Sequence, residues 1–245
     1  MSEYIDFARF YDRLMYDCDY DRRADYLLSL FDRFACKPKL MLDLACGTGN
    51  FTYRMAQRGV DVIGVDMSAD MLGIAGEKAD IYNVSPLFLC QRADELDLYG
   101  TIDSCICTLD SVNHITDYDE LCRAFGKVSL FMEKGGLFIF DVNTEYKHEV
   151  VLGDNTFVTD DGELYTVWSN ENDGKFVNIT LDFFLRKGDI YERYSEEFSE
   201  RAYTDEELEN ALKNAGFETV AVYGDMTFDA PEPDEERKIF IARKI

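Results

Sequence analysis

The spacing of apolar residues predicts helices at the start of the chain. Between residues 3 and 36, apolar side chains recur three and four positions apart, which is the period of a helix that buries one face. The first of two predicted helices carries the apolar residues Phe7, Phe10, Tyr11, Leu14 and Met15. Residues 1–36 are therefore expected to form a helical cover on the domain that follows.

Beyond this segment, short apolar runs alternate with helical segments. The first run, residues 39–45, ends in a Gly-x-Gly turn, as a buried strand does when it enters a tight turn. The later runs are residues 60–65, 87–91, 102–107, 136–142, 217–223 and 238–243. Strands that alternate with helices pair in parallel. The sequence therefore predicts an α/β fold with a doubly wound, seven-stranded, mainly parallel sheet whose final strand is antiparallel.

Residues 155–200 follow a different period. Apolar and mostly polar positions alternate, as in a half-buried antiparallel strand, and the apolar set is Val177, Ile179, Leu181, Phe183 and Leu185. Turn signals on both sides predict three strands, at about 162–169, 175–186 and 190–200. We therefore expect residues 1–154 and 201–245 to form one Rossmann-like domain. The antiparallel insertion after its fifth strand is expected to be either a lid on the substrate side or a dimer surface.

The charge balance argues against polyanionic partners. The chain carries 25 basic and 49 acidic residues, a formal net charge of −24. Nucleic-acid affinity depends on Lys and Arg that neutralise phosphates, so nucleic acids and anionic membranes are poor partners. No apolar run approaches the roughly 20 residues that cross a bilayer, and the N-terminus lacks the pattern of a secretory signal. We expect a cytoplasmic protein that is a monomer or a homodimer.

The cysteines predict neither disulfides nor a metal site. Their number is seven, and no Cys-x-x-Cys pair is present. His114 and His148 are the only histidines that could help to bind a metal. The thiols are expected to be small core residues, and no metal is expected.

The first strand–turn–helix is the most informative candidate site. Asp43 stands near the carboxyl end of the first strand, and Gly47 and Gly49 let the backbone approach a ligand. A dinucleotide site requires Gly-x-Gly-x-x-Gly, but Thr52 occupies the third glycine position. A carboxylate four residues before Gly47 repels a pyrophosphate and suits a cationic amino-acid group. The turn therefore favours methyl transfer over hydride transfer.

The segment Leu42-Asp-Leu-Ala-Cys-Gly-Thr-Gly-Asn50 resembles the first motif of the class I S-adenosylmethionine (SAM) dependent methyltransferases. The resemblance covers residues 37–145 and 201–245, and residues 155–200 resemble more loosely the lid of small-molecule N-methyltransferases. It implies SAM as cofactor and a methyl-transfer activity.

The resemblance also implies roles for individual residues. Asp66 would hold the ribose hydroxyls, Met67 would lie against the adenine, and Asp94 would accept from the adenine amino group. The segment that begins at Tyr4 resembles a family start in which a Tyr, here Tyr11, closes over the cofactor. The implied cofactor-binding residues are Tyr11, Asp43, Ala45, Cys46, Gly47, Gly49, Asp66, Met67, Asp94, Glu95, Leu109 and Asp110. Structural alternatives remain open: Asp66 could favour the following helix N-terminus, and Asp94 could be a solvated loop acid.

Catalytic residues are less well defined by the sequence. Positioning can supply much of the acceleration of a methyl transfer, and a base is needed only where the acceptor must lose a proton. The candidate bases are His114, His148 and Tyr203. Because residues 109–114 lack the Asn/Asp-Pro-Pro-Tyr stretch of enzymes that act on planar amides and nucleobases, a small-molecule acceptor is expected, through nitrogen rather than oxygen. The alternatives are a tRNA or protein methyltransferase, or a SAM-binding protein without catalysis.

Overall fold

Two helices open the part of the chain that the structure describes. The structure is a computed structural model that describes residues 5–245, so the expectation for Tyr4 lies outside the described residues. Helix α1 spans Ile5–Leu14 and helix α2 spans Tyr20–Arg33, as the helical period predicts. Asp19 caps α2 by accepting the backbone N–H of Arg22, which satisfies a donor that the first turn of a helix leaves free.

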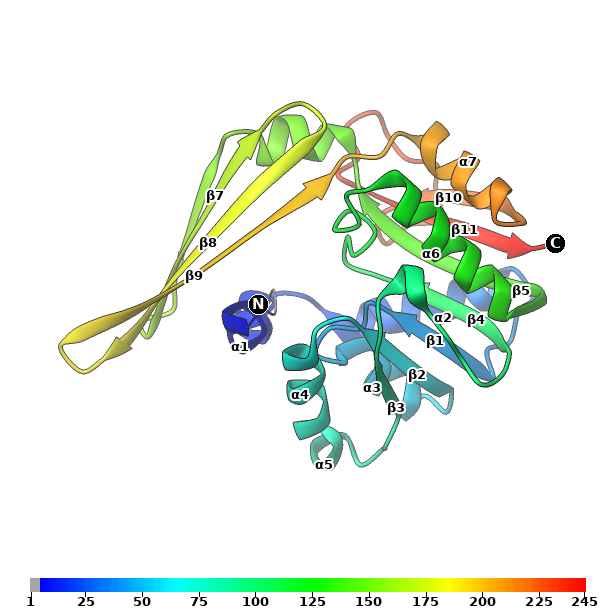
Figure 1. Ribbon diagram of the computed structural model, residues 1–245, viewed down its shortest axis with the longest axis horizontal. Coiled ribbons are helices and arrows are strands. Elements are labelled where there is room, and N and C mark those ends of the chain that lie inside the picture. The colour runs from blue at the N-terminus through cyan, green and yellow to red at the C-terminus, as the bar shows by residue number, and fades with distance from the viewer. Residues whose placement is uncertain (1–4) are drawn as a thin grey trace.

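A seven-stranded sheet forms the centre of the fold (Figure 1). Its strands stand in the order β10-β11-β5-β4-β1-β2-β3. Their bounds are β1 Leu40–Leu44, β2 Asp61–Asp66, β3 Leu87–Cys90, β4 Ile102–Cys107, β5 Met132–Asn143, β10 Phe217–Gly224 and β11 Arg237–Lys244. Strand β11 is antiparallel to both of its neighbours, and the remaining pairs are parallel. The predicted fold class is confirmed.

Helices cover both faces of this sheet. They are α3 Asn50–Gln57, α4 Ala69–Glu77, α5 Ala79–Tyr82, α6 Tyr118–Phe131 and α7 Asp205–Asn214, with a short 3₁₀ turn at Ala93–Glu95. Successive residues of β5 point to opposite faces: Phe138 packs edge-on against Phe125 of α6, and Ile139 belongs to the core beneath α2. Thr204 and Glu207 form the predicted capping box at the start of α7.

The insertion after β5 is a separate antiparallel sheet with four strands. They are β6 Thr156–Asp160, β7 Leu164–Asn172, β8 Phe176–Lys187 and β9 Ile190–Arg201, paired in that order. The prediction of three strands is wrong in number. All residues of β6 are exposed at the edge of the sheet, so burial imposes no alternation on their sequence. A π-helical turn, Lys147–Leu152, joins β5 to the insertion and was not predicted either.

Helix α1 lies between this second sheet and the main domain (Figure 1). On one side, the ring of Phe10 stacks on Phe183 of β8, with 4.7 Å between the centroids. On the other side, the carboxylate of Asp12 accepts the hydroxyl of Thr48 at 2.7 Å and pairs with Lys78 at 2.6 Å. Burial acts against the charge of Asp12, but these partners outweigh it and lower the pKa of the carboxyl. The helix is therefore fastened to both parts.

Within residues 5–245, no helix is long and apolar enough to cross a membrane.

Candidate functional site

A cavity of about 730 Å³ opens at the carboxyl edge of the seven-stranded sheet. Its floor comes from the ends of β1, β2 and β4, and its walls come from α1 and from β7, β8 and β9 of the insertion. Eight of the twelve predicted cofactor residues line it: Tyr11, Ala45, Gly47, Asp66, Met67, Asp94, Leu109 and Asp110. The fold thus brings together residues that are up to 99 positions apart in the chain, from Tyr11 to Asp110.

The glycine turn after β1 shapes one end of the cavity. Gly49 has φ +76°, which L side chains rarely adopt, and a Cβ there would lie 3.0 Å from the ring of Phe88, closer than an ordinary contact, so both the backbone and the space favour glycine. Gly47 has φ +53° and open space where a Cβ would stand. Its N–H donates to Asp66 at 2.8 Å, which joins the turn to the end of β2. The backbone at Gly47 is therefore accessible to a ligand.

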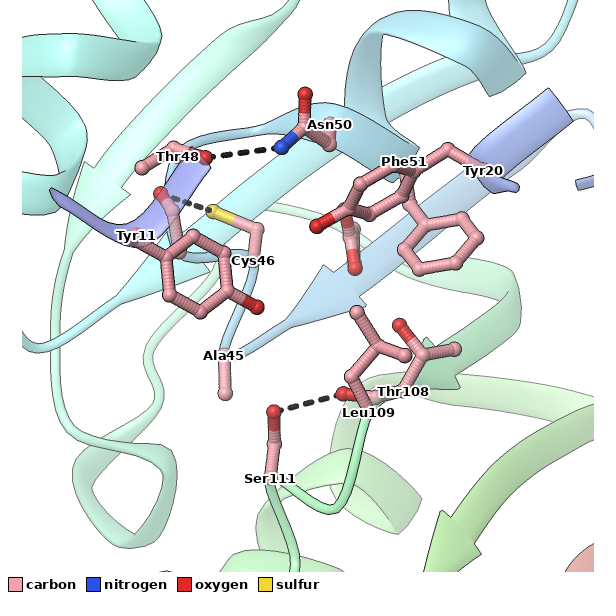
Figure 2. A pocket seen from close by; sticks show the side chains of 12 residues that line it. Tyr11, Tyr20, Ala45, Cys46, Thr48, Asn50, Phe51, Thr108, Leu109 and Ser111 are labelled. Atoms are coloured by element: carbon pink, nitrogen blue, oxygen red, sulfur yellow. Dashed lines mark hydrogen bonds between the residues drawn. The ribbon is translucent and has the colours of Figure 1, made fainter. Parts of the chain in front are cut away.

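Asp43 borders a smaller pocket of about 30 Å³ beside the main cavity (Figure 2). Figure 2 shows Tyr11 and Leu109 facing this pocket, and both residues also line the large cavity. The Asp43 side chain accepts the hydroxyl of Thr52 at 2.5 Å, and the residue is 1% exposed. Burial outweighs this hydrogen bond and raises the pKa of Asp43 to about 7. A positively charged ligand group would stabilise its ionised form.

The end of β2 and the loop after β3 supply two further carboxylates. Asp66 accepts the backbone N–H groups of Gly47 and Ser68, each at 2.8 Å. Burial raises the pKa of Asp66, and these two hydrogen bonds oppose the shift. Asp94 is held by Arg92 at 3.0 Å and by Arg123 at 3.3 Å.

The loop after β4 is held by ionic contacts. Leu109 and Asp110 both have φ 56°, a conformation that residues other than glycine rarely adopt. The carboxylate of Asp141 accepts their two backbone N–H groups, at 2.8 and 2.7 Å. Arg237 bonds both Asp141 and, at 2.5 Å, the side chain of Asp110. Burial would raise the pKa of Asp110, but Arg237, Lys147 and His114 outweigh it and hold this pKa at about 2.

Besides Asp43, three of the predicted cofactor residues do not line the large cavity. Cys46 borders only the smaller pocket, and burial raises the pKa of its thiol. Gly49 caps α3 and lines neither space. Glu95 is exposed and also lines neither space.

Of the three candidate bases, only His114 lines the cavity. Its Nε2 lies 3.9 Å from Oε1 of Glu200, and its ring lies 5.1 Å from that of Phe198. His148 is buried behind the wall and contacts Oε2 of Glu200 at 3.1 Å. Tyr203 is 2% exposed, and its hydroxyl donates to the carbonyl of Ile115.

Sequence reasoning missed several polar residues of the cavity. Glu200, Lys147, Asn143 and Arg237 line it but carry no motif. They stand at the ends of β9, β5 and β11 and in the π-helical turn, so only tertiary contacts bring them to the site. One signal could have indicated Glu200: it stands opposite the buried Val177 of β8, so it belongs to the inward face of β9.

Comparisons with known proteins agree on one family. Residues 41–136 match the family described as a methyltransferase domain. A putative methyltransferase from Geobacillus sp. (strain WCH70) is 32% identical over 245 residues, which cover 98% of this chain and 99% of that protein. A solved S-adenosylmethionine-dependent methyltransferase from Clostridium acetobutylicum ATCC 824 is 34% identical, with a TM-score of 0.90 and 98% of each chain covered. A glycine/sarcosine N-methyltransferase from Parasynechococcus marenigrum is 30% identical over 149 residues, which cover 57% of this chain and 50% of that protein.

The raised pKa of Asp43 predicts a pH-dependent stability. Because this pKa is about 7 in the folded chain, against about 3.9 for an unfolded Asp, the folded state keeps a proton that the unfolded state has lost between these values. Stability from this group therefore falls as the pH rises from about 4 to about 7. The difference in unfolding free energy between wild type and Asp43→Asn should fall across that window, by no more than about 1.4 kcal/mol per pH unit. Urea titrations at several pH values measure it, and a constant difference would contradict the assignment.

Proposed function

The chain belongs to the class I S-adenosylmethionine-dependent methyltransferases, and we propose that it methylates a small molecule bound in the 730 Å³ cavity. One observation carries the proposal. The cavity is lined both by the glycine turn and Asp66 and by His114 and residues of the insertion. A donor and a small acceptor could therefore lie together in one cavity.

The residues at the glycine end fit the cofactor. Asp66 faces the cavity and would accept from the ribose hydroxyls, while Met67 and Asp94 would border the adenine. Asp43, whose pKa burial raises, would be stabilised in its ionised form by a cationic ligand group. When bound, SAM supplies a methyl group on a positively charged sulfur, which needs no further activation. The chain then has to orient the acceptor, exclude water and accept a proton.

His114 is the residue that we assign as base. It alone among the three candidates lines the cavity, beside Asp110 of the loop after β4. A nitrogen acceptor has to present a free lone pair, and a base at this place would remove the proton that blocks it. The names of the relatives do not select the acceptor atom, because N-methyltransferases and O-methyltransferases both match part of this chain.

We assign the insertion and α1 as the cover of the acceptor rather than as a dimer surface. The inner face of the insertion is already occupied, because Phe183 and Tyr194 pack on Phe10 of α1. Trp168 and Leu181, from the same sheet, line the cavity. The aromatic residues left exposed on this sheet include Tyr165 and Tyr191.

The ribose assignment predicts a loss of cofactor affinity. Asp66→Ala should weaken SAM binding by about 1–3 kcal/mol, the range for hydrogen bonds to a charged group. The matched control is Asp61→Ala, since Asp61 is exposed at the opposite end of the same strand and does not line the cavity. Isothermal titration with SAM measures both variants. Wild-type affinity in a folded Asp66→Ala protein would refute the assignment.

The base assignment predicts a separation of catalysis from cofactor binding. His114→Asn should lower kcat by about 100-fold or more, the contribution of a general base, and leave the Kd of SAM within about twofold. Tyr203→Phe is the control, because Tyr203 does not line the cavity and the change removes only its hydroxyl, which donates to the backbone carbonyl of Ile115. The readout is formation of S-adenosylhomocysteine with the best acceptor from a panel of small amines. An unchanged kcat in His114→Asn would exclude the role.

A further inference from the structure

Glu200 is a buried carboxylate that faces the cavity. It is 2% exposed, and its Oε2 accepts the side-chain amide of Asn143 at 3.0 Å and contacts Nε2 of His148 at 3.1 Å. Its other oxygen, Oε1, lies 3.9 Å from Nε2 of His114. One oxygen is therefore fixed by the protein, and the other is directed towards His114.

The charge of Glu200 lacks a permanent counter-ion. Among residues 5–245, its ion pairs are with His114 and His148, and neither Lys nor Arg pairs with it. Burying a carboxylate without a compensating charge is costly, so such a group favours a cation beside it. The nearby Asp110 is a second carboxylate, and Arg237, its partner, is shared with Asp141.

Three groups that can bind such a cation lie close together. One ligand atom from each of Asp110, His114 and Glu200 lies within 4.8 Å of the other two. Because none of these atoms is more than 4.8 Å from another, one nitrogen can lie about 2.9 Å from all three. A primary ammonium group has three N–H donors, one for each of these atoms.

We propose that Asp110, His114 and Glu200 bind the acceptor as an alkylammonium ion, so that the substrate is an aliphatic amine. The inference rests on the proposed function and narrows it to one substrate class. Neutral amides and alcohols lack the charge that the three groups select.

A divalent metal fits the same groups less well. Metal-bound oxygen and nitrogen ligands lie about 2.1 Å from the ion and therefore roughly 3.0–3.4 Å from one another. Oε1 of Glu200 and Nε2 of His114 are 3.9 Å apart, so they would have to approach each other to share a metal ion, whereas slightly bent N–H donors of one nitrogen reach both as they stand. Asp110 already holds the guanidinium of Arg237, which would repel a double positive charge.

The same arrangement moves the proton that must leave the amine. The proton passes from the ammonium nitrogen to the imidazole of His114 and leaves a lone pair on the nitrogen. Once the amine has turned so that this lone pair faces the methyl carbon of SAM, it forms the new N–C bond, while the S–C bond breaks and its electron pair stays on the sulfur of S-adenosylhomocysteine. The positive charge on His114 then lies 3.9 Å from Oε1 of Glu200, which stabilises it. The methylated nitrogen becomes cationic again and remains matched to the site. Glu200 acts in this step as a positioning residue, held in turn by Asn143 and His148.

Matched acceptor pairs test the substrate class. Wild-type protein with SAM is offered aliphatic amines and the alcohols of the same skeletons: amino sugars and sugars, amino acids and hydroxy acids, and alkylamines and alkanols. We expect methylation of amine members only, unaffected by EDTA. Glu200→Gln should lower kcat/KM for the amine at least about 30-fold, move its pH profile, and leave the Kd of SAM within about twofold. Glu197→Gln is the control, because Glu197 is exposed on the same strand and does not line the cavity.

A binding measurement makes the test independent of turnover. Trp168 is the only tryptophan and lines the cavity, so its fluorescence reports ligands there. Protein saturated with S-adenosylhomocysteine should bind cyclohexylamine at neutral pH at least about tenfold more tightly than cyclohexanol, a preference that Glu200→Gln removes. Equal binding of the two, methylation of the alcohols, or an activity that chelation abolishes and Mg²⁺ restores would overturn the inference. Methylated alcohols would leave the proposed function standing, whereas a protein that binds no SAM would overturn the proposed function itself.

Discussion

The carboxylate of Asp141 holds the loop after β4, which contributes residues to both the cofactor site and the acceptor site that we propose. Its two oxygens accept the N–H groups of Leu109 and Asp110, which fixes two successive left-handed residues that would otherwise be unfavourable. Arg237 balances this charge and reaches on to Asp110. Leu109 then faces the pocket beside Asp43, and Asp110 joins the triad with His114 and Glu200. One carboxylate of β5 thus sets the backbone that both the cofactor and the acceptor would contact.

Several carboxylates of the site favour cationic ligands. Asp43, Asp66 and Glu200 are buried or nearly buried carboxylates without a Lys or Arg partner among the described residues. Burial raises the pKa of the first two, so their ionised forms gain most from a cationic ligand. A sulfonium donor and an ammonium acceptor are both cations. The acidic lining therefore suits the chemistry that we propose, and the net charge of −24 would draw such ligands towards the protein.

The sequence predicted the elements that depend on local periodicity. It did not predict the features that depend on contacts between residues far apart in the chain. All seven strands of the main sheet follow from short apolar runs, and the glycine turn follows from its motif. Strand β6 was not predicted, because an exposed edge strand imposes no alternation of apolar and polar residues. Glu200 was not predicted as a site residue, because its position depends on contact with Asn143, 57 residues away, and on the register of β9 on β8. His148 was a candidate base, but the π-helical turn places it behind Glu200 instead.

A crystal structure of the protein with S-adenosylhomocysteine tests the central claim most directly. The claim is that one cavity holds the donor at the glycine turn and the acceptor beneath the insertion. We expect ribose hydroxyls bonded to Asp66, the adenine against Met67, and a sulfur atom directed towards Asp110, His114 and Glu200. A sulfur directed away from these three residues, or a ligand bound outside the cavity, would contradict it.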